Sequence, residues 1–325
     1  EMVRSDWSSD VCSSDLIMVT KSEEEGIFLE AVGNMIDDYL TKPVSPLQLY
    51  LSIRKNIEKE DIVTESLSRN YIKNYRLLSA MLEKEPDADG WIKINGIITD
   101  LSMKLDEIKD PNLTETFDDL RLNANAVFGA YIQSMYKNWL EDRKNGPVLS
   151  TDIIDKYILN DIGKEKQALI IIDCFPYDQM AIIGDILKDS FSVTKDSYYS
   201  ILPTATEFAR NAIFSGLMPS EIEDKYPELF SGSLDDETSS NRFEKELLER
   251  QLSAKGTDVK IKYDKIYKIE EFTKLESSIS EYRDIPFAAI VVNMVDFLIH
   301  SRKKDEIVSE MMVNESSYRA TIKSW

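Results

Sequence analysis

Hydrophobic positions in residues 17–60 fall into short apolar runs separated by amphipathic stretches. The spacing predicts strand, helix, strand and helix in that order, at 16–19, 23–31, 35–40 and 46–60. Two strands alternating with two helices at this spacing are typical of the end of a doubly wound sheet. We therefore expect residues 17–60 to be the C-terminal remnant of a doubly wound α/β domain.

The pattern then becomes helical, with apolar residues recurring every three or four positions through about residue 146. The segments centre on 71–81, on 94–105 and on 115–140, and a turn signal at 86–90 separates the first two. They predict an all-α bundle over 61–146, closed by a boundary at 145–147. The bundle carries no candidate chemistry, so we expect a spacer that self-associates. Polar substitutions at Phe128 and Tyr131 should then disrupt the association.

From residue 147 the chain returns to alternating strands and helices, which predicts a further α/β domain over 147–325. We expect strands at 168–172, 198–202, 259–263 and 287–293. Helices are expected from Pro176 and over 205–216, 244–252 and 269–280, with Gly216 closing the second of these.

Charge and cysteine content limit the partners. The chain has 59 acidic and 39 basic residues, and its net charge of -20 opposes a broad nucleic-acid-binding surface. The longest apolar stretch is shorter than the roughly 20 residues needed to cross a bilayer, so no membrane span is expected. Two cysteines indicate no disulfide framework and a cytoplasmic location, with Cys174 as a small core residue.

In the first sixteen residues, the apolar positions follow neither the period of a helix nor that of a strand. These residues are similar to a translated sequencing adaptor joined to an open reading frame, and a natural disordered arm is the alternative. An artificial join implies that the natural chain begins further upstream and that this sequence is a fragment.

Candidate chemistry follows the predicted strands of the last domain. Asp173 comes directly after one apolar run, and Asp296 and His300 follow another, about one helical turn apart. Thr206 lies just before the glycine-closed helix. A divalent metal could use the carboxylates and the imidazole. Taken singly, Asp173 and Thr206 are as readily explained as helix caps, and it is their order and context that favour a phosphoester hydrolase.

Residues 38–43, Asp-Tyr-Leu-Thr-Lys-Pro, resemble the closing motif of response-regulator receiver domains. The resemblance implies that Thr20 and Lys42 hold a phosphoryl group and that Tyr39 is the switch aromatic. In that family the acidic pair and the phosphorylated aspartate lie on earlier strands, which this sequence does not contain. Read without the resemblance, Thr20 is a strand-end cap and Lys42 a solvated surface charge.

Residues 202–217 resemble the nucleophile segment of the alkaline phosphatase superfamily, and its PglZ branch most closely. With the receiver remnant and the bundle, the arrangement is similar to PorX-type response regulators with a PglZ effector. The resemblance implies that Thr206 is the nucleophile between two zinc ions, that Asp173 binds the first ion, and that Asp296 and His300 bind the second. Ala209 replaces an asparagine that often holds the phosphate in relatives. Arg210 or Asn211 could substitute for it.

The resemblance further implies a phosphorylation-controlled phosphodiesterase or phosphatase acting on oligonucleotide-type phosphoesters. Its partners would be a sensor histidine kinase and, when phosphorylated, a second copy of the chain. The superfamily also uses an Asp-His pair and another histidine, whereas His300 is the single histidine of this sequence. We therefore expect a partial PglZ domain that is inactive by itself. The alternative is a non-catalytic signalling module that dimerises through receiver and bundle.

Overall fold

The computed structural model describes residues 17–20, 38–57, 59–108, 110–230 and 241–301, together with 317, 319 and 320. The adaptor-like residues 1–16 and the expected helix at 23–31 lie outside these ranges. The chain divides into two compact units, and each is described by itself. The first comprises residues 1–77 and 107–110, and the second comprises 78–106 and 111–325.

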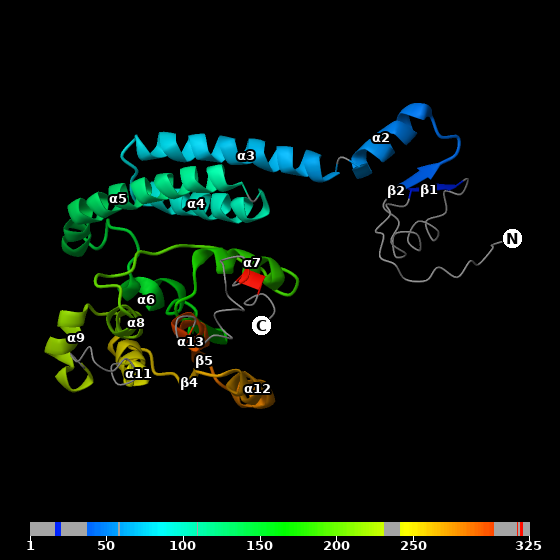
Figure 1. Ribbon diagram of the computed structural model, residues 1–325. Helices are drawn as coiled ribbons and strands as arrows, with labels where there is room; N and C mark the ends of the chain where they lie inside the picture. Colours follow the sequence, from blue (N-terminus) through cyan, green and yellow to red (C-terminus); the bar gives the residue numbers. More distant parts are fainter. Residues whose placement is uncertain are drawn as a thin grey trace. The chain divides into compact units, whose positions relative to one another are not determined.

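The first unit contains a two-stranded parallel sheet followed by a helix (Figure 1). Strand β1 (Ile17–Thr20) pairs with β2 (Asp38–Thr41), and α2 (Pro46–Ile57) comes next. Ser45 and Gln48 cap α2 reciprocally, because the Gln48 amide donates to the Ser45 hydroxyl at 3.1 Å and the Ser45 amide donates to Oε1 of Gln48 at 3.0 Å. The two strands pair in parallel, as neighbouring strands of a doubly wound sheet do, and the assignment of residues 17–60 to such a domain stays a prediction.

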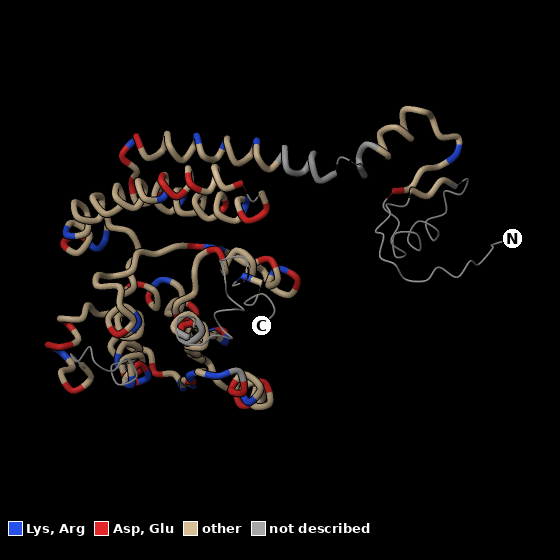
Figure 2. The backbone as a smooth tube through the Cα atoms, in the orientation of Figure 1, with Lys and Arg blue, Asp and Glu red and all other residues tan. Residues whose placement is uncertain are grey.

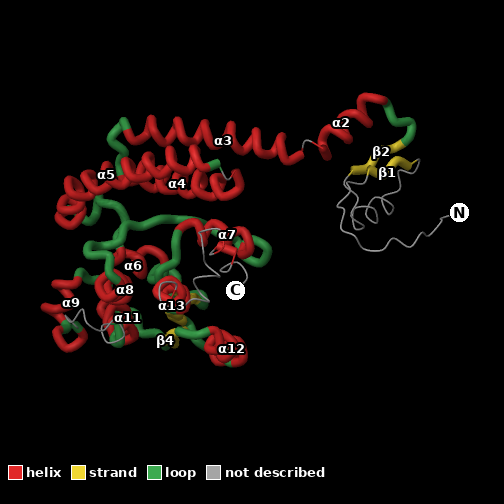
Figure 3. The backbone as a smooth tube through the Cα atoms, in the orientation of Figure 1, coloured by secondary structure: helices red, strands yellow, loops and turns green. Residues whose placement is uncertain are grey.

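Long helices follow, as the apolar periodicity predicted. They are α3 (Lys59–Leu82), α4 (Ala88–Ile108) and α5 (Pro111–Glu141). Figure 3 shows α4 and α5 running side by side. One detail of the prediction was wrong, because α4 begins inside the expected turn at 86–90. Asp87 starts the helix, since its Oδ1 accepts the Gly90 amide at 2.8 Å.

The α/β part of the second unit is built on a parallel sheet with the strand order β3-β5-β4. The strands are β3 (Gln167–Ile172), β4 (Ile261–Ile266) and β5 (Phe287–Val292). The prediction of β3 and β5 is confirmed, and β4 begins two residues later than expected. The expected strand at 198–202 was wrong, because this segment forms only a single bridge, between Leu149 and Tyr199.

Helices and 3-10 turns precede, connect and follow these strands. The helices are α6 (Ile153–Tyr157), α7 (Tyr177–Leu187), α8 (Thr206–Ser215), α9 (Pro219–Lys225), α11 (Glu244–Ala254), α12 (Ile269–Ser277) and α13 (Met294–Ser301). The turns are η1 (Ser150–Asp152), η2 (Pro227–Leu229) and η3 (Ile279–Tyr282). Gly216 ends α8 with a φ of 68°, so the predicted glycine stop is confirmed. No helix in the described ranges is long and apolar enough to cross a membrane.

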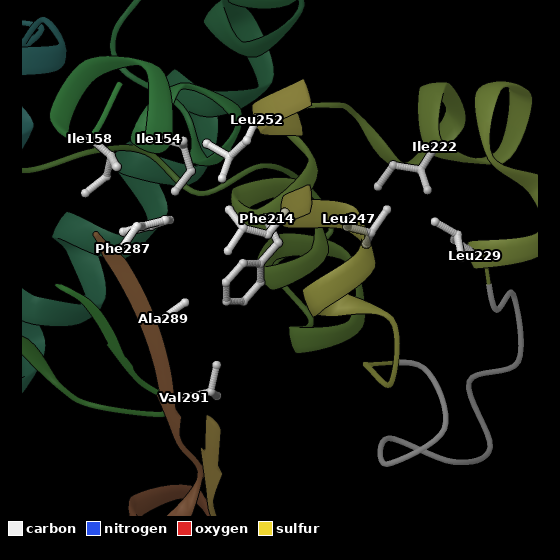
Figure 4. Packing of buried hydrophobic residues seen from close by; sticks show 11 residues of the cluster. Ile154, Ile158, Phe214, Ile222, Leu229, Leu247, Leu252, Phe287, Ala289 and Val291 are labelled. Atoms are coloured by element: carbon white, nitrogen blue, oxygen red, sulfur yellow. The ribbon is translucent and has the colours of Figure 1, made fainter. Parts of the chain in front are cut away.

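The main core of the second unit lies between β5 and the helices α6, α8 and α11 (Figure 4). Phe214 of α8 is fully buried, and it lies between Leu247 of α11 and the β5 residues Ala289 and Val291. Burying a large apolar side chain stabilises a fold by about 1.5–3 kcal/mol. The C-terminal half of α8 is therefore fixed firmly against the sheet.

Candidate functional site

The carboxyl edge of the β3-β5-β4 sheet gathers polar residues. Asp173 follows β3, Asn293 follows β5 and Tyr267 follows β4. The Asp173 amide donates to the Val292 carbonyl at 3.0 Å, and the Asn293 amide donates to the Ile266 carbonyl at 2.8 Å, so the strand ends stay aligned. In open α/β sheets this edge is where ligands bind.

Arg210 reaches this edge from α8, and its guanidinium is hydrogen-bonded to several polar side chains there. One terminal nitrogen of its guanidinium donates to Oδ2 of Asp173 and to Oδ1 of Asn293, both at 2.8 Å. Its Nε donates to Oε1 of Glu244. The Arg210 side chain is only 5 % exposed. Arg210 is therefore a buried counter-ion that ties α8 to the ends of two strands.

Glu244, at the start of α11, is the buried anion of this network and was missed by the sequence analysis. Its side chain is 0 % exposed. Besides Arg210, it contacts Nζ of Lys265 at 2.8 Å and accepts the hydroxyl of Tyr263. Burial and the neighbouring Glu244 raise the pKa of Tyr263, which therefore remains a hydroxyl donor. Buried charges are tolerated when they are paired in this way.

Asp173 experiences opposing influences. Burial raises the pKa of its carboxyl group, the Arg210 cation lowers it, and the Asp296 carboxylate raises it again, with a net upward shift. The carboxylates of Asp173 and Asp296 thus lie close enough for their charges to interact.

Cys174 is exposed, so its interpretation as a core residue was wrong. Its φ of 54° turns the chain sharply as it leaves β3, and the side chain comes out at the sheet edge. Partial burial of the sulfur and the nearby Asp296 carboxylate raise the pKa of the thiol to about 11. Cys174 is therefore a neutral thiol beside Asp296 rather than a thiolate.

Asp296 and His300 are brought together on α13, one turn apart, as predicted. Oδ1 of Asp296 lies 3.3 Å from Nε2 of His300. The imidazole is 63 % exposed and the carboxylate 21 %. The His300 imidazole is therefore largely in solvent, whereas the Asp296 carboxylate is mostly covered by protein.

Thr206 is the first residue of α8 and is partly buried, four residues before Arg210 and hence on the same helix face. Asn211 is nearly buried, and its Nδ2 donates to the Glu207 carbonyl at 2.7 Å, within α8. Nε and one terminal nitrogen of Arg210, and Nδ2 of Asn211, thus donate to protein acceptors. Their suggested contact with a phosphate stays a prediction.

The receiver residues occupy the end of the small sheet of the first unit. Thr20 is the last residue of β1 and pairs with Thr41, so Lys42 lies one residue beyond the same edge. Tyr39 lies within β2, and its amide is bonded to Oδ1 of Asp38 at 3.0 Å. Lys42 is exposed. Thr20 and Lys42 therefore lie at the ends of neighbouring strands, and their phosphoryl role stays a prediction.

The donor side chains at the sheet edge determine whether a metal ion could bind there. Within the described ranges, no three His, Cys, Asp or Glu side chains converge closely enough to hold one. Asp173 is already engaged by Arg210. In the described part of the chain, Asp296 and His300 have the donor types and the spacing of a ligand pair. The described residues therefore fit part of a metal centre and not a complete one.

The fold and the site define the class of the last domain. A parallel sheet with acidic residues at its carboxyl edge, and a helix whose Arg210 binds one of them, is consistent with an alkaline phosphatase-like domain. Residues 155–325 match the family model described as the BREX system PglZ alkaline phosphatase-like domain. Because this match covers more than half of the chain, the protein belongs to the PglZ family.

Residues 61–140 match a second family model, the PorX response regulator linker domain. The long helices α3, α4 and α5 account for most of this region. A response-regulator linker followed by a PglZ domain confirms the predicted PorX-type arrangement. No curated protein matches the chain.

Proposed function

We propose that the protein is a response regulator whose PglZ domain is a metal-dependent phosphoester hydrolase, with Thr206 as its nucleophile. The observation that carries the proposal is the arrangement at the sheet edge. Thr206 begins the helix whose Arg210 binds Asp173. The charge of Asp296 in turn raises the pKa of Asp173. A cation and two carboxylates at one edge of an alkaline phosphatase-like fold, with Thr206 on the helix that carries the cation, support the proposal.

In the proposed reaction, the Thr206 oxygen attacks phosphorus and the alcohol of the substrate leaves. Water then hydrolyses the phosphothreonine and regenerates the hydroxyl. The N-terminus of α8 favours negative charge at Thr206, because its free amides and helix dipole point there. Zinc is the proposed cofactor, and Asp173, Asp296 and His300 are its proposed ligands in this chain.

The proposed substrate is an oligonucleotide-type phosphoester. Acidic and basic residues are both scattered along the described backbone (Figure 2), and the chain has a net charge of -20. Such a chain favours recognition of one phosphoester at a local site over a grip along a polyanion. A sensor histidine kinase and a second, phosphorylated copy are the proposed partners, since the linker is that of a response regulator.

Two candidate residues of the proposed self-association also have contacts within the chain. Phe128 and Tyr131, named as candidate association residues, lie inside an aromatic cluster of the same chain. The Phe128 ring centroid is 5.0 Å from that of Trp91, and the Tyr131 centroid is 5.8 Å from that of Trp139. Polar substitutions at these positions would also affect the fold of the chain itself, so the association test must measure Tm beside the association state, and their role in self-association stays a prediction.

The test is hydrolysis of bis(p-nitrophenyl) phosphate and of a short oligonucleotide, with zinc present, by the protein expressed from its complete gene. Thr206→Ala should lower kcat by at least about 100-fold, because removing a nucleophile leaves only binding and electrostatic catalysis. Thr204→Ala is the matched control, since it removes an exposed threonine hydroxyl two residues earlier. Equal turnover by wild type and Thr206→Ala would reject the nucleophile. Absence of turnover from both, together with phosphorylation-dependent association, would favour the non-catalytic signalling module.

A further inference from the structure

The segment immediately before Thr206 is held by the linker helices rather than by the sheet. The Leu202 amide donates to the hydroxyl of Tyr136, on α5, at 2.8 Å. The hydroxyl of Tyr199 donates to the carbonyl of Ala88, the first residue of α4, at 2.7 Å. The Tyr199 ring centroid lies 4.8 Å from that of Trp139, also on α5. Both ends of the segment 199–202 therefore contact the linker.

Residues that follow α5 provide further support. The Tyr199 amide donates to the Val148 carbonyl at 2.8 Å, and the Ile201 amide donates to Oγ of Ser150 at 3.1 Å. Ile201 is fully buried and belongs to the same hydrophobic cluster as Trp139. These contacts explain why the alternating sequence at 198–202 does not join the sheet, because its amides are already bonded elsewhere.

The connection to Thr206 is short. Residues 203–205 are exposed, and α8 begins at the next position. The far end of α8 is fixed in the core by Phe214. Thr206 therefore lies between a helix anchored in the PglZ core and a segment anchored on the linker, and both anchors determine where its hydroxyl lies.

We propose that Tyr136 and Trp139 of the linker are positioning residues for Thr206, so that the linker sets the hydrolytic activity of the PglZ domain. The inference rests on the proposed function, because it assigns regulation to the same nucleophile. A movement of α5 relative to residues 199–202 would break the Tyr136 bond and the contact of Trp139 with Tyr199. A displacement of about 1 Å at a reacting group can lower a rate by about 100-fold.

The test compares Tyr136→Phe with Tyr282→Phe in the protein expressed from its complete gene. Each substitution removes one tyrosine hydroxyl that is hydrogen-bonded in the structure. The Tyr282 hydroxyl donates to Oδ2 of Asp264 on β4, at 2.5 Å, so its loss does not involve residues 199–202. Tyr136→Phe should lower kcat about tenfold with KM and Tm nearly unchanged, because the segment loosens without loss of the aromatic core. Amide hydrogen exchange at Leu202 should become faster. Tyr282→Phe should change none of these quantities.

The exchange measurement separates two possible failures. Wild-type turnover by Thr206→Ala would reject the nucleophile, whereas the exchange rate of Leu202 is measured without turnover. Unchanged exchange at Leu202 in Tyr136→Phe would show that the linker does not hold the segment. Faster exchange with unchanged kcat would show that it holds the segment without positioning the nucleophile. Either result overturns the inference. A fall in Tm that accounts for the lost activity would also reject it, as a purely structural effect.

Discussion

Glu244→Gln is the substitution that most directly tests how the sheet edge is stabilised. Glu244 is fully buried and is the shared anion for Arg210 and Lys265. Glutamine keeps the shape of the side chain and removes its charge. The substitution would leave Lys265, whose side chain is only 15 % exposed, without this ion pair. Arg210 would keep Asp173 as its remaining anionic partner.

The expected loss follows from the geometry. At the 2.8 Å separation of Lys265 and Glu244, the attraction is about 6 kcal/mol for an effective dielectric constant of about 20. Desolvation offsets part of this gain, and removal of one partner from a buried pair costs about 3–5 kcal/mol. For a domain as long as the matched region 155–325, each kcal/mol lowers Tm by about 2–4 °C. We therefore expect a fall in Tm of about 10 °C.

Urea unfolding followed by tryptophan fluorescence gives the free energy of unfolding for each variant. Glu228→Gln is the matched control, because Glu228 pairs with Arg250 at the same 2.8 Å but both side chains are about half exposed. An exposed pair contributes about 0–1 kcal/mol. Equal losses in the two variants would refute the argument that burial makes the Glu244 network important.

Two further predictions concern backbone strain and acid stability. Gly216→Ala should destabilise the protein by more than the 1–2 kcal/mol typical of a left-handed non-glycine residue, because the added Cβ would collide with the Gln251 side chain. Gly256→Ala, with a similar φ of 72° and open space around it, should show the backbone cost alone in thermal unfolding. The unfolding free energy of Asp173→Asn relative to wild type should be higher at pH 7 than at pH 3, because wild type loses stability as the pH rises through the raised pKa of Asp173. A gap in unfolding free energy that is the same at both pH values would contradict this, and would point to the lost Arg210 bond instead.

The sequence was sufficient where a local pattern decides the structure. The apolar runs before Asp173 and Asn293 became β3 and β5, because buried parallel strands are read as continuous hydrophobic stretches. The start and the glycine end of α8 were also predicted from their neighbours in the chain. The one-turn spacing of Asp296 and His300 was predicted because it depends only on helix geometry.

Long-range contacts decided the rest. Nothing near Glu244 in the sequence distinguishes it from the other acidic residues of α11, and its burial arises only when Arg210 and Lys265 approach from distant segments. The segment 198–202 has the alternating apolar and polar residues of a strand, but its amides at Ile201 and Leu202 are bonded to the side chains of Ser150 and Tyr136 instead. Tertiary partners outweighed local propensity in both cases.

The two ends of α8 are therefore held by different kinds of contact, and this difference bears on how a signal could reach the site. Its C-terminal half is fixed by Phe214 within the PglZ core, where a shift would cost apolar contacts with β5 and α11. Its N-terminus follows a segment whose bonds to Tyr136 and Ala88 can be exchanged for bonds to water at small cost. A movement of the linker would consequently alter Thr206 before it disturbed the core. Under the proposed function, this asymmetry lets a response-regulator linker change activity while the effector domain stays folded.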